Sequence, residues 1–185
     1  MSVLEIRPET AQRSMELARR HDVKTLLNPA PATRLDPTLL ALVDVLTPNE
    51  GELRILLGLH PDDPTDTFEL ARRLLALGAR QIVVTRGARG ALIVHADATL
   101  EDVPGVPTDV VDTTGAGDAF TCALAVALAE GQTLSAAVRF ATCAGALACT
   151  RLGVIPALPT RAAVEALMRE RYAGSSPSAA IKVRR

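Results

Sequence analysis

The residues best suited to chemistry in this sequence lie in one short segment, residues 112–120, which reads DTTGAGDAF. A glycine-rich turn that opens into a helix exposes backbone N–H groups at the positive end of that helix, where anions bind. Gly115 and Gly117 carry no side chain, so a phosphate oxygen can approach the backbone closely. Asp118 falls in the first turn of the expected helix. A phosphoryl group and a proton acceptor would therefore meet at this point.

The same pattern also has a purely structural interpretation. Gly-Ala-Gly can be only a tight turn, and Asp118 can be only a carboxylate that stabilises the start of a helix by about 0.3–1 kcal/mol. The preceding Asp-Thr-Thr and the long helix of small residues that follows favour the phosphate site. The sequence has no Walker GxxxxGK[ST] motif, no HRD loop and no GxGxxG after an early strand, which excludes three common nucleotide-site designs.

Length and composition narrow the function classes. A chain of 185 residues predicts about one domain. With 48% hydrophobic residues, 22% charged residues and a net charge of −1, it is neither extensively disordered nor a general nucleic-acid binder. Aromatic residues make up 2%, so stacking platforms for nucleic-acid bases are scarce. No apolar run is long enough to span a membrane and no leader is visible, so we expect a cytoplasmic protein without a membrane partner.

The cysteines and histidines show no metal-site spacing. Cys122, Cys143 and Cys149 form no CxxC pair, so we expect them in the core rather than in disulfides or a zinc site. The histidines form no HExxH motif, and we expect them in loops or on the surface.

Strands and helices alternate over the first 85 residues, as in a mostly parallel sheet with helices on its faces. Hydrophobic periodicity predicts strands at 3–6, 24–28, 44–47 and 81–85, with helices at 8–20, 36–42, 48–57 and 65–77. Residues 28–32 (NPAPA) must form a turn, because a residue that precedes proline avoids the helical region. Residues 86–90 connect strand 81–85 to an antiparallel partner at 91–95, which predicts a hairpin.

The second half of the chain is predicted to be helical. We expect helices from the GAGD turn to residue 130, at 134–150 and at 160–171. The first two are apolar nearly all round, which predicts that they lie in the interior. Residues 173–185 are rich in Ser, Pro and Ala and are expected to form a disordered tail after a single unit at 1–172.

Several motifs together resemble the ribokinase-like sugar kinases of the PfkB family. Residues 112–120 are similar to the C-terminal signature of that family, and the other matching segments follow in the family's order: 28–32 (NPAPA), 47–52 (TPNEGE), 84–90 (VTRGARG) and 150–157 (TRLGVIPA). The resemblance implies a Rossmann-like three-layer α/β fold with helices on both faces of a mostly parallel sheet. It also implies transfer of the γ-phosphoryl group of ATP to a primary hydroxyl of a sugar, with Mg²⁺ and K⁺ as cofactors.

The resemblance assigns roles to particular residues. Asp118 would take the proton of the sugar hydroxyl, while the amides of Gly115, Ala116 and Gly117 would hold the charge of the transferred phosphoryl group. Residues implied to bind ATP are Asn49, Thr85, Arg86, Gly87, Ala88, Arg89, Gly90, Gly117, Asp118 and Thr142. Glu5 and Asp118 would contact the sugar, and Glu52 would act on Mg²⁺ indirectly. The K⁺ loop would comprise Asp112, Thr114, Ala148, Arg151, Gly153 and Ala157.

Some of these assignments compete with structural interpretations. Asn49 after Pro48 can simply cap a helix, and the glycines of 84–90 can simply form a hairpin turn. Glu5 can be an exposed charge. Ala157 stands where family members have a hydroxyl, which makes strong K⁺ activation doubtful.

Family members also have an N-terminal half with a GGKGAN-like sugar-binding segment and a small β-sheet lid, and residues 1–185 contain no counterpart of either. The chain thus resembles a C-terminal half. Three explanations are open: a subunit completed by a separately encoded N-terminal half, a truncated remnant with little activity, or a full kinase gene whose start is wrongly placed at Met1. A nucleotide-binding module without catalysis of its own is the alternative function. The NPAPA segment favours ribose as the sugar, with fructose, ketodeoxygluconate or a nucleoside as alternatives, and a homodimer partner is a further expectation.

Overall fold

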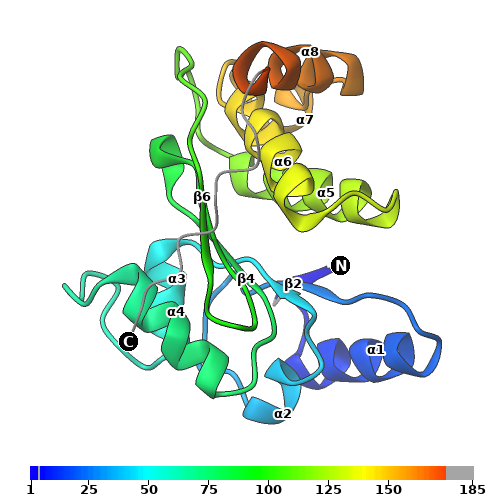
Figure 1. The fold of residues 1–185 in the computed structure, drawn as a ribbon, viewed down its shortest axis with the longest axis vertical. Coiled ribbons are helices and arrows are strands. Elements are labelled where there is room, and N and C mark those ends of the chain that lie inside the picture. Colours follow the sequence, from blue (N-terminus) through cyan, green and yellow to red (C-terminus); the bar gives the residue numbers. More distant parts are fainter. Residues whose placement is uncertain (4, 174–185) are drawn as a thin grey trace. The chain divides into compact units, whose positions relative to one another are not determined.

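The computed structural model describes residues 1–3 and 5–173 of the chain (Figure 1). These residues form two compact units. Of the described residues, unit 1 comprises those of Met1–Thr85 and Leu92–Leu100, and unit 2 comprises Arg86–Ala91 and those that follow from Glu101. Apart from Ala173, the predicted tail at 173–185 lies outside the described residues.

Unit 1 contains the parallel part of the sheet. Its elements in chain order are β1 (Ser2–Val3), α1 (Pro8–Arg20), β2 (Leu26–Asn28), α2 (Pro37–Leu40), β3 (Val45–Leu46), α3 (Glu50–Leu56), α4 (Thr67–Ala76) and β4 (Ile82–Thr85). Each strand from β1 to β4 pairs in parallel with the next. Helix α1 begins at Pro8, where the missing proline N–H costs no helical hydrogen bond. The predicted alternation of strands and helices is confirmed.

The sheet has six strands in the order β1 to β6. Strands β5 (Ala91–Val94) and β6 (Leu100–Val103) follow β4 with short connections, which join antiparallel neighbours because a parallel pair needs a long crossover. The predicted hairpin after residue 85 is therefore confirmed, and the fold is α/β with a mixed sheet. Strand β6 was not predicted, because its sequence LEDV has only one apolar residue at each end.

Large aliphatic side chains fill the core of unit 1. Leu27 of β2, Leu46 of β3 and Ile82 of β4 are completely buried. Leu53 of α3 and Leu70 of α4 belong to the same cluster. Figure 1 shows α3 and α4 side by side, in agreement with their packing contacts.

Unit 2 is mainly helical. It contains α5 (Ala116–Ala129), α6 (Leu134–Ala148), α7 (Val154–Ala157) and α8 (Arg161–Tyr172), and α6 packs against both α5 and α8. Helix α6 ends two residues before the prediction, because the chain turns at Cys149, whose carbonyl accepts hydrogen bonds from the amides of Val111 and Asp112. Helix α7 is too short to show a periodic signal and was not predicted.

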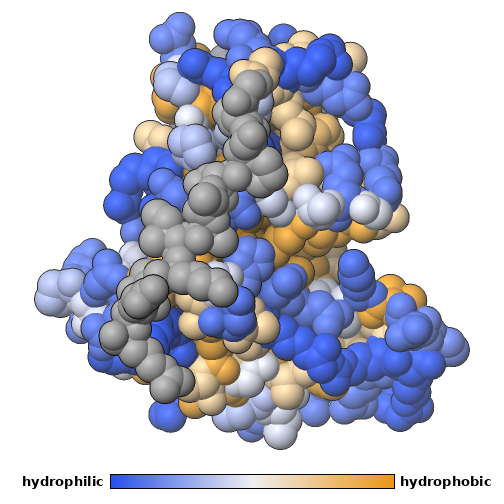
Figure 2. All heavy atoms as spheres, viewed as in Figure 1, coloured by the Kyte–Doolittle hydropathy of each residue, from blue (hydrophilic) through white to orange (hydrophobic). Residues whose placement is uncertain are grey.

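The prediction that α5 and α6 lie wholly in the interior is wrong for α5. Its side chains at Phe120 and Leu124 are buried, but Val126 is 48% exposed and Cys122 is exposed as well. Cys122 therefore corrects the expectation that all three cysteines are core residues, whereas Cys143 is buried. Burial raises the pKa of the Cys143 thiol to about 11. Apolar residues reach the surface among charged ones over the helices of unit 2 (Figure 2).

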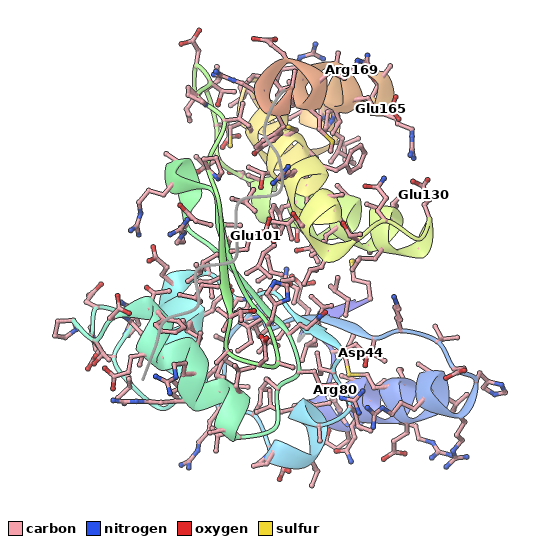
Figure 3. All side chains as sticks on the ribbon, in the orientation of Figure 1. Asp44, Arg80, Glu101, Glu130, Glu165 and Arg169 are labelled. Atoms are coloured by element: carbon pink, nitrogen blue, oxygen red, sulfur yellow. The ribbon has the colours of Figure 1, made fainter. Side chains whose placement is uncertain are left out.

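Glu101, Glu130 and Glu165 of unit 2, which Figure 3 labels, each form an ion pair with an arginine. Arg161 of α8 pairs with Glu130 after α5 at 2.7 Å and with Glu165 at 2.9 Å. Glu101 of β6 is buried and is paired with Arg139 of α6 at 3.6 Å. None of the helices in residues 1–3 and 5–173 is long and apolar enough to cross a membrane.

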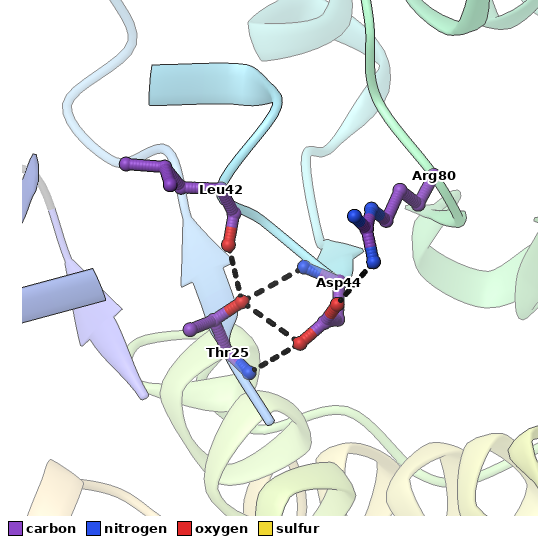
Figure 4. Close-up of polar contacts among 4 residues, drawn as sticks. All are labelled: Thr25, Leu42, Asp44 and Arg80. Carbon is purple, nitrogen blue, oxygen red and sulfur yellow. Dashed lines mark hydrogen bonds and ion pairs between the residues drawn. The ribbon is translucent and has the colours of Figure 1, made fainter. Parts of the chain in front are cut away.

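A polar cluster joins the amino ends of β2 and β3 (Figure 4). The Thr25 hydroxyl is buried and donates to the Leu42 carbonyl at 2.6 Å, while the Asp44 amide donates to this hydroxyl at 2.9 Å. The Asp44 carboxylate accepts from the Thr25 amide at 2.9 Å and lies 3.3 Å from Arg80. Strand β2 begins at Leu26, two residues after the prediction, because the Thr25 amide donates to the Asp44 carboxylate instead of to a carbonyl of a neighbouring strand.

The Thr25→Val variant tests this cluster. It removes the hydroxyl, so the Leu42 carbonyl loses this donor and the Asp44 amide keeps only the Thr25 carbonyl as an acceptor. We therefore expect a loss of about 0.5–1.5 kcal/mol in the free energy of unfolding. Urea denaturation monitored by circular dichroism measures this change. Thr38→Val is the matched control, because the Thr38 hydroxyl bonds to Asp36 in an exposed position of the same unit. Equal stability of the two variants would contradict the prediction.

Candidate functional site

The amino end of α5 is shaped by Gly115. This residue is the N-cap of the helix and has a φ of +78°, a left-handed conformation that L side chains rarely adopt. A Cβ atom at this position would lie 2.8 Å from Cγ1 of Val154. Glycine is therefore required here both by the backbone and by the neighbouring side chain. Gly117 differs, because a Cβ there would meet no atom within 4 Å.

Several amides at this helix end have no acceptor. The Ala116 amide donates to the Thr113 carbonyl at 3.2 Å, and the helical ladder begins with the Ala119 amide on Gly115 at 2.9 Å. Within the described part of the chain, the amides of Gly115, Gly117 and Asp118 donate to no backbone or side-chain oxygen. An anion could accept from these groups at once, whereas the Ala116 amide would first have to leave Thr113.

Asp118 lies in the first turn of α5 and is exposed. Its carboxylate thus stands at the same helix end as the free amides of Gly115 and Gly117. A proton acceptor and free amide donors are therefore available within one helical turn.

The Asp112 carboxylate joins two loops beside this helix end. Its Oδ1 accepts from the Thr114 amide at 2.9 Å, and its Oδ2 accepts from the Gly153 amide at 3.2 Å. These amide bonds, that of Thr114 first, lower the pKa of Asp112 below its ordinary value. The charge is therefore retained at neutral pH, and each oxygen keeps a lone pair for a cation.

The remaining residues of the expected K⁺ loop lie on the same stretch of chain. Ala148 is the last residue of α6, Arg151 is exposed in the following turn, and Ala157 is buried at the end of α7. The structure joins Asp112, Thr114 and Gly153 directly by hydrogen bonds. Asp112 and Gly153 are far apart in sequence, so the fold brings this carboxylate to the turn at Gly153, and the K⁺ role of these residues stays a prediction.

Helix α6 positions the amino end of α5 through Gly145, a residue outside all of the recognised motifs. A Cβ on Gly145 would lie 3.3 Å from the Ala116 carbonyl oxygen and 3.5 Å from Cβ of Phe120. One turn earlier on α6, Thr142 is buried, and its hydroxyl donates to the Val138 carbonyl at 2.8 Å. Only the small residue spacing of α6, AxxxG at positions 141–145, hints at this close packing.

The glycine-rich hairpin turn lies in unit 2 and closes on itself. The Arg86 amide donates to the Gly90 carbonyl at 2.8 Å, and the Gly90 amide donates to Gly87 at 3.0 Å. Gly87 has a φ of +57°, and the turn between these glycines is a short 3₁₀ helix (Gly87–Arg89). Ala88 and Arg89 are exposed on this turn.

Asn49 and Glu52 of unit 1 form a capping box on α3. The Asn49 side chain accepts from the Glu52 amide at 2.8 Å, and the Glu52 carboxylate accepts from the Asn49 amide at 2.8 Å. The capping interpretation of Asn49 is therefore confirmed. Partial burial raises the pKa of Glu52, and the bond from the Asn49 amide opposes this shift. One carboxylate oxygen of Glu52 makes this bond, which leaves the other for a water or metal ligand.

Residues of unit 1 that were expected at the site follow carboxyl ends of parallel strands. Thr85 ends β4 and bridges to Asn49, which comes three residues after β3. Glu5 is exposed in the turn after β1. Ligands of open α/β sheets bind at the carboxyl ends of the strands, and the Thr25 cluster lies at the opposite, amino ends.

Metal-binding side chains do not cluster elsewhere. Among residues 1–3 and 5–173, no group of three or more His, Cys, Asp and Glu could hold a metal ion. The oxygens of Asn49, Glu52 and Asp112 suit hard cations such as Mg²⁺ and K⁺, which also take backbone carbonyls and water. In chemical terms, unit 2 can hold an anion and a proton acceptor, and unit 1 offers oxygen ligands at a strand edge.

Comparisons with known proteins agree with this chemistry. A model of the pfkB family of carbohydrate kinases matches residues 2–161. The ribokinase of Bacillus subtilis is 40% identical over 166 residues, which are 89% of this chain and 53% of that protein. The chain spans about half the length of the curated relatives it matches.

Solved structures show the same fold. An Arabidopsis thaliana ribokinase, solved with ribose and ATP, superimposes with a TM-score of 0.81 and 30% identity over 90% of this chain and 54% of its own. The Escherichia coli phosphofructokinase-2, solved with potassium, reaches a TM-score of 0.73 at 24% identity over 89% of this chain and 53% of its own. The family match extends over most of the sequence and contains every motif described above, so the chain belongs to the pfkB family of carbohydrate kinases.

Proposed function

We propose that this chain is the nucleotide-binding part of a kinase that transfers the γ-phosphoryl group of ATP to a primary hydroxyl of ribose. The observation that carries the proposal is the amino end of α5, where free amides of Gly115 and Gly117 stand beside the Asp118 carboxylate. The ribose and ATP held by the Arabidopsis relative support this choice of substrates. Fructose, ketodeoxygluconate and a nucleoside are alternative acceptors.

The chemistry is an in-line displacement. The sugar hydroxyl oxygen forms a bond to the γ-phosphorus, the bond from that phosphorus to the β,γ-bridging oxygen breaks, and ADP leaves. Asp118 accepts the hydroxyl proton as the new bond forms, since the hydroxyl becomes acidic only then. The amides of Gly115 and Gly117 stabilise the negative charge on the phosphoryl oxygens. Ala116 would join them once its amide leaves Thr113.

The nucleotide and cation roles rest on the other segments. Gly87, beside which no atom lies within 4 Å of an added Cβ, allows the ATP to approach the hairpin backbone closely. Mg²⁺, when bound, would neutralise the charge of the ATP phosphates, and Asn49 and Glu52 would hold it through water. Asp112, with Thr114 and Gly153, would hold K⁺ and thereby fix the loop that leads into α5.

A nucleotide-binding module without catalysis of its own is the second candidate. It is favoured by one observation, the coverage of about half the length of the relatives. Exclusion of water normally protects a transferring phosphoryl group. Calorimetry with ATP–Mg²⁺ and ribose, followed by a coupled ADP-release assay, separates the candidates. Ribose-dependent ADP release identifies a kinase, ATP binding without turnover identifies a module, and absence of ATP binding contradicts both.

Asp118→Asn tests the proton acceptor. The amide side chain keeps the size of the carboxylate but cannot take a proton, so we expect ribose-dependent ADP release to fall by about 10²–10⁴-fold. The affinity for ATP–Mg²⁺ should stay within about twofold, because the backbone amides are unchanged. Asp109→Asn, an exposed carboxylate of the same unit, is the control. Full turnover of the Asp118 variant would remove the proposed role of this residue.

Asp112→Ala tests the cation loop. Without the carboxylate, the Thr114 and Gly153 amides lose their shared acceptor, and a cation loses its charged ligand. We expect KCl to raise ATP affinity, relative to tetramethylammonium chloride, in the wild type but not in this variant. Because the pKa of Asp112 is lowered from its ordinary value, the carboxylate remains charged and the K⁺ effect should be constant between about pH 7 and pH 5. An equal K⁺ effect in both proteins would exclude Asp112 as a ligand.

A further inference from the structure

The guanidinium of Arg86 faces the hairpin of its own segment. Its Nη2 donates to the Asp102 carboxylate of β6, to the Ala91 carbonyl at 3.3 Å and to the Arg89 carbonyl at 3.4 Å. These acceptors lie within the turn, just after it and on the neighbouring strand. The Arg86 side chain is 15% exposed, whereas Asp102 is 57% exposed. The charge of Arg86 is thus directed into the hairpin.

The main chain of Arg86 closes the same turn. Its amide donates to the Gly90 carbonyl at 2.8 Å, and its carbonyl accepts from the Arg89 amide at 3.2 Å. Arg86 therefore fixes the turn through both its backbone and its side chain.

The opposite side of the turn rests directly on residues 103–105. A Cβ on Gly90 would lie 2.2 Å from the Val103 carbonyl oxygen, and a Cβ on Gly105 would lie 2.0 Å from the Ala88 carbonyl oxygen. The Tyr172 hydroxyl of α8 donates to the Pro104 carbonyl at 2.9 Å, which holds this support in place. The turn cannot move toward residues 103–105. The contacts of Arg86 therefore restrict its movement in the other directions.

A contribution to folding stability does not explain why arginine stands at position 86. Within the described residues its Nε is buried and has no hydrogen-bond partner, an arrangement that costs free energy. Its ion-pair partner Asp102 is more than half exposed, and such pairs contribute little to folding. An apolar side chain of similar length would fold at least as well at this position.

We infer that Arg86 is a positioning residue, which together with Asp102 holds the backbone of Gly87–Arg89 in the geometry that receives the adenine nucleotide, without a contact of its own to the phosphates. The inference rests on the proposed function and revises the role that the family resemblance implied for Arg86. A preformed turn binds more tightly because less ordering is required on binding.

The test uses Arg86→Met, Arg86→Lys, Asp102→Asn and the Arg86→Met/Asp102→Asn double variant of the full chain. Calorimetry gives the affinities for ATP, ADP and AMP, and thermal denaturation gives the unfolding midpoint. We expect Arg86→Met to weaken all three nucleotides by the same factor, about tenfold. The double variant should lose no more nucleotide affinity than Arg86→Met alone, because both changes remove the same contact between Arg86 and Asp102. Lysine carries the charge without the planar guanidinium, so the nucleotide affinity of Arg86→Lys should lie between those of the wild type and Arg86→Met.

Stability provides the second readout. The unfolding midpoint of Arg86→Met should match that of the wild type, and exchange of the amide hydrogens in 87–90 should be faster. Arg161→Met is the control, because it removes ion pairs from the same unit away from the turn. It should leave nucleotide affinity and exchange in 87–90 unchanged.

The outcomes separate the inference from the proposed function. If Arg86→Met weakens ATP much more than AMP, Arg86 contacts the phosphates and the inference is overturned. Provided that the wild type binds ATP, unchanged nucleotide affinities in Arg86→Met also overturn the inference. Wild-type affinities in Arg86→Lys would overturn it as well. If the wild type binds none of the three nucleotides, the proposed function fails and the inference fails with it.

Discussion

The candidate site depends on one carboxylate that joins two distant loops. Asp112 accepts hydrogen bonds from Thr114, just before α5, and from Gly153, just before α7. Val154 then lies against Gly115, so the second loop also fixes the residue at which the helix begins. This connection between the two loops therefore sets the direction of the amides at the start of α5. A change in the loop at 153 would therefore act on the phosphate site without touching a phosphate.

Local signals in the sequence predicted much of the fold and the candidate site. Proline at position 8, the β-branched run before Thr85 and the glycines of the GAGD turn each specify local backbone geometry, and their elements appear where expected. Long-range contacts could not be predicted in this way. The end of α6 is set by bonds from Val111 and Asp112, and the shortened β2 by Asp44, partners that lie far away in sequence.

The direction of long side chains also could not be predicted from the sequence. The family pattern places Arg86 in the nucleotide loop, and a positive charge beside phosphates is the natural expectation. Its guanidinium instead faces Asp102 and two carbonyls, because the hairpin brings β6 beside the turn. Asn49 shows the converse case, since the capping box that the sequence allowed is present and still leaves oxygens for a cation.

These observations explain why the proposed phosphate site can be predicted from the sequence while the residues around it cannot. A site made of backbone amides requires glycine wherever the chain must adopt a positive φ or approach another atom closely, and both conditions hold at Gly115. Such requirements leave a fixed spacing of glycines. Residues such as Gly145 and Arg86 act through packing and hydrogen bonds across the fold, which many sequences can supply in other ways. The glycine pattern therefore indicates phosphate chemistry, and the structure identifies the side chains that hold it in position.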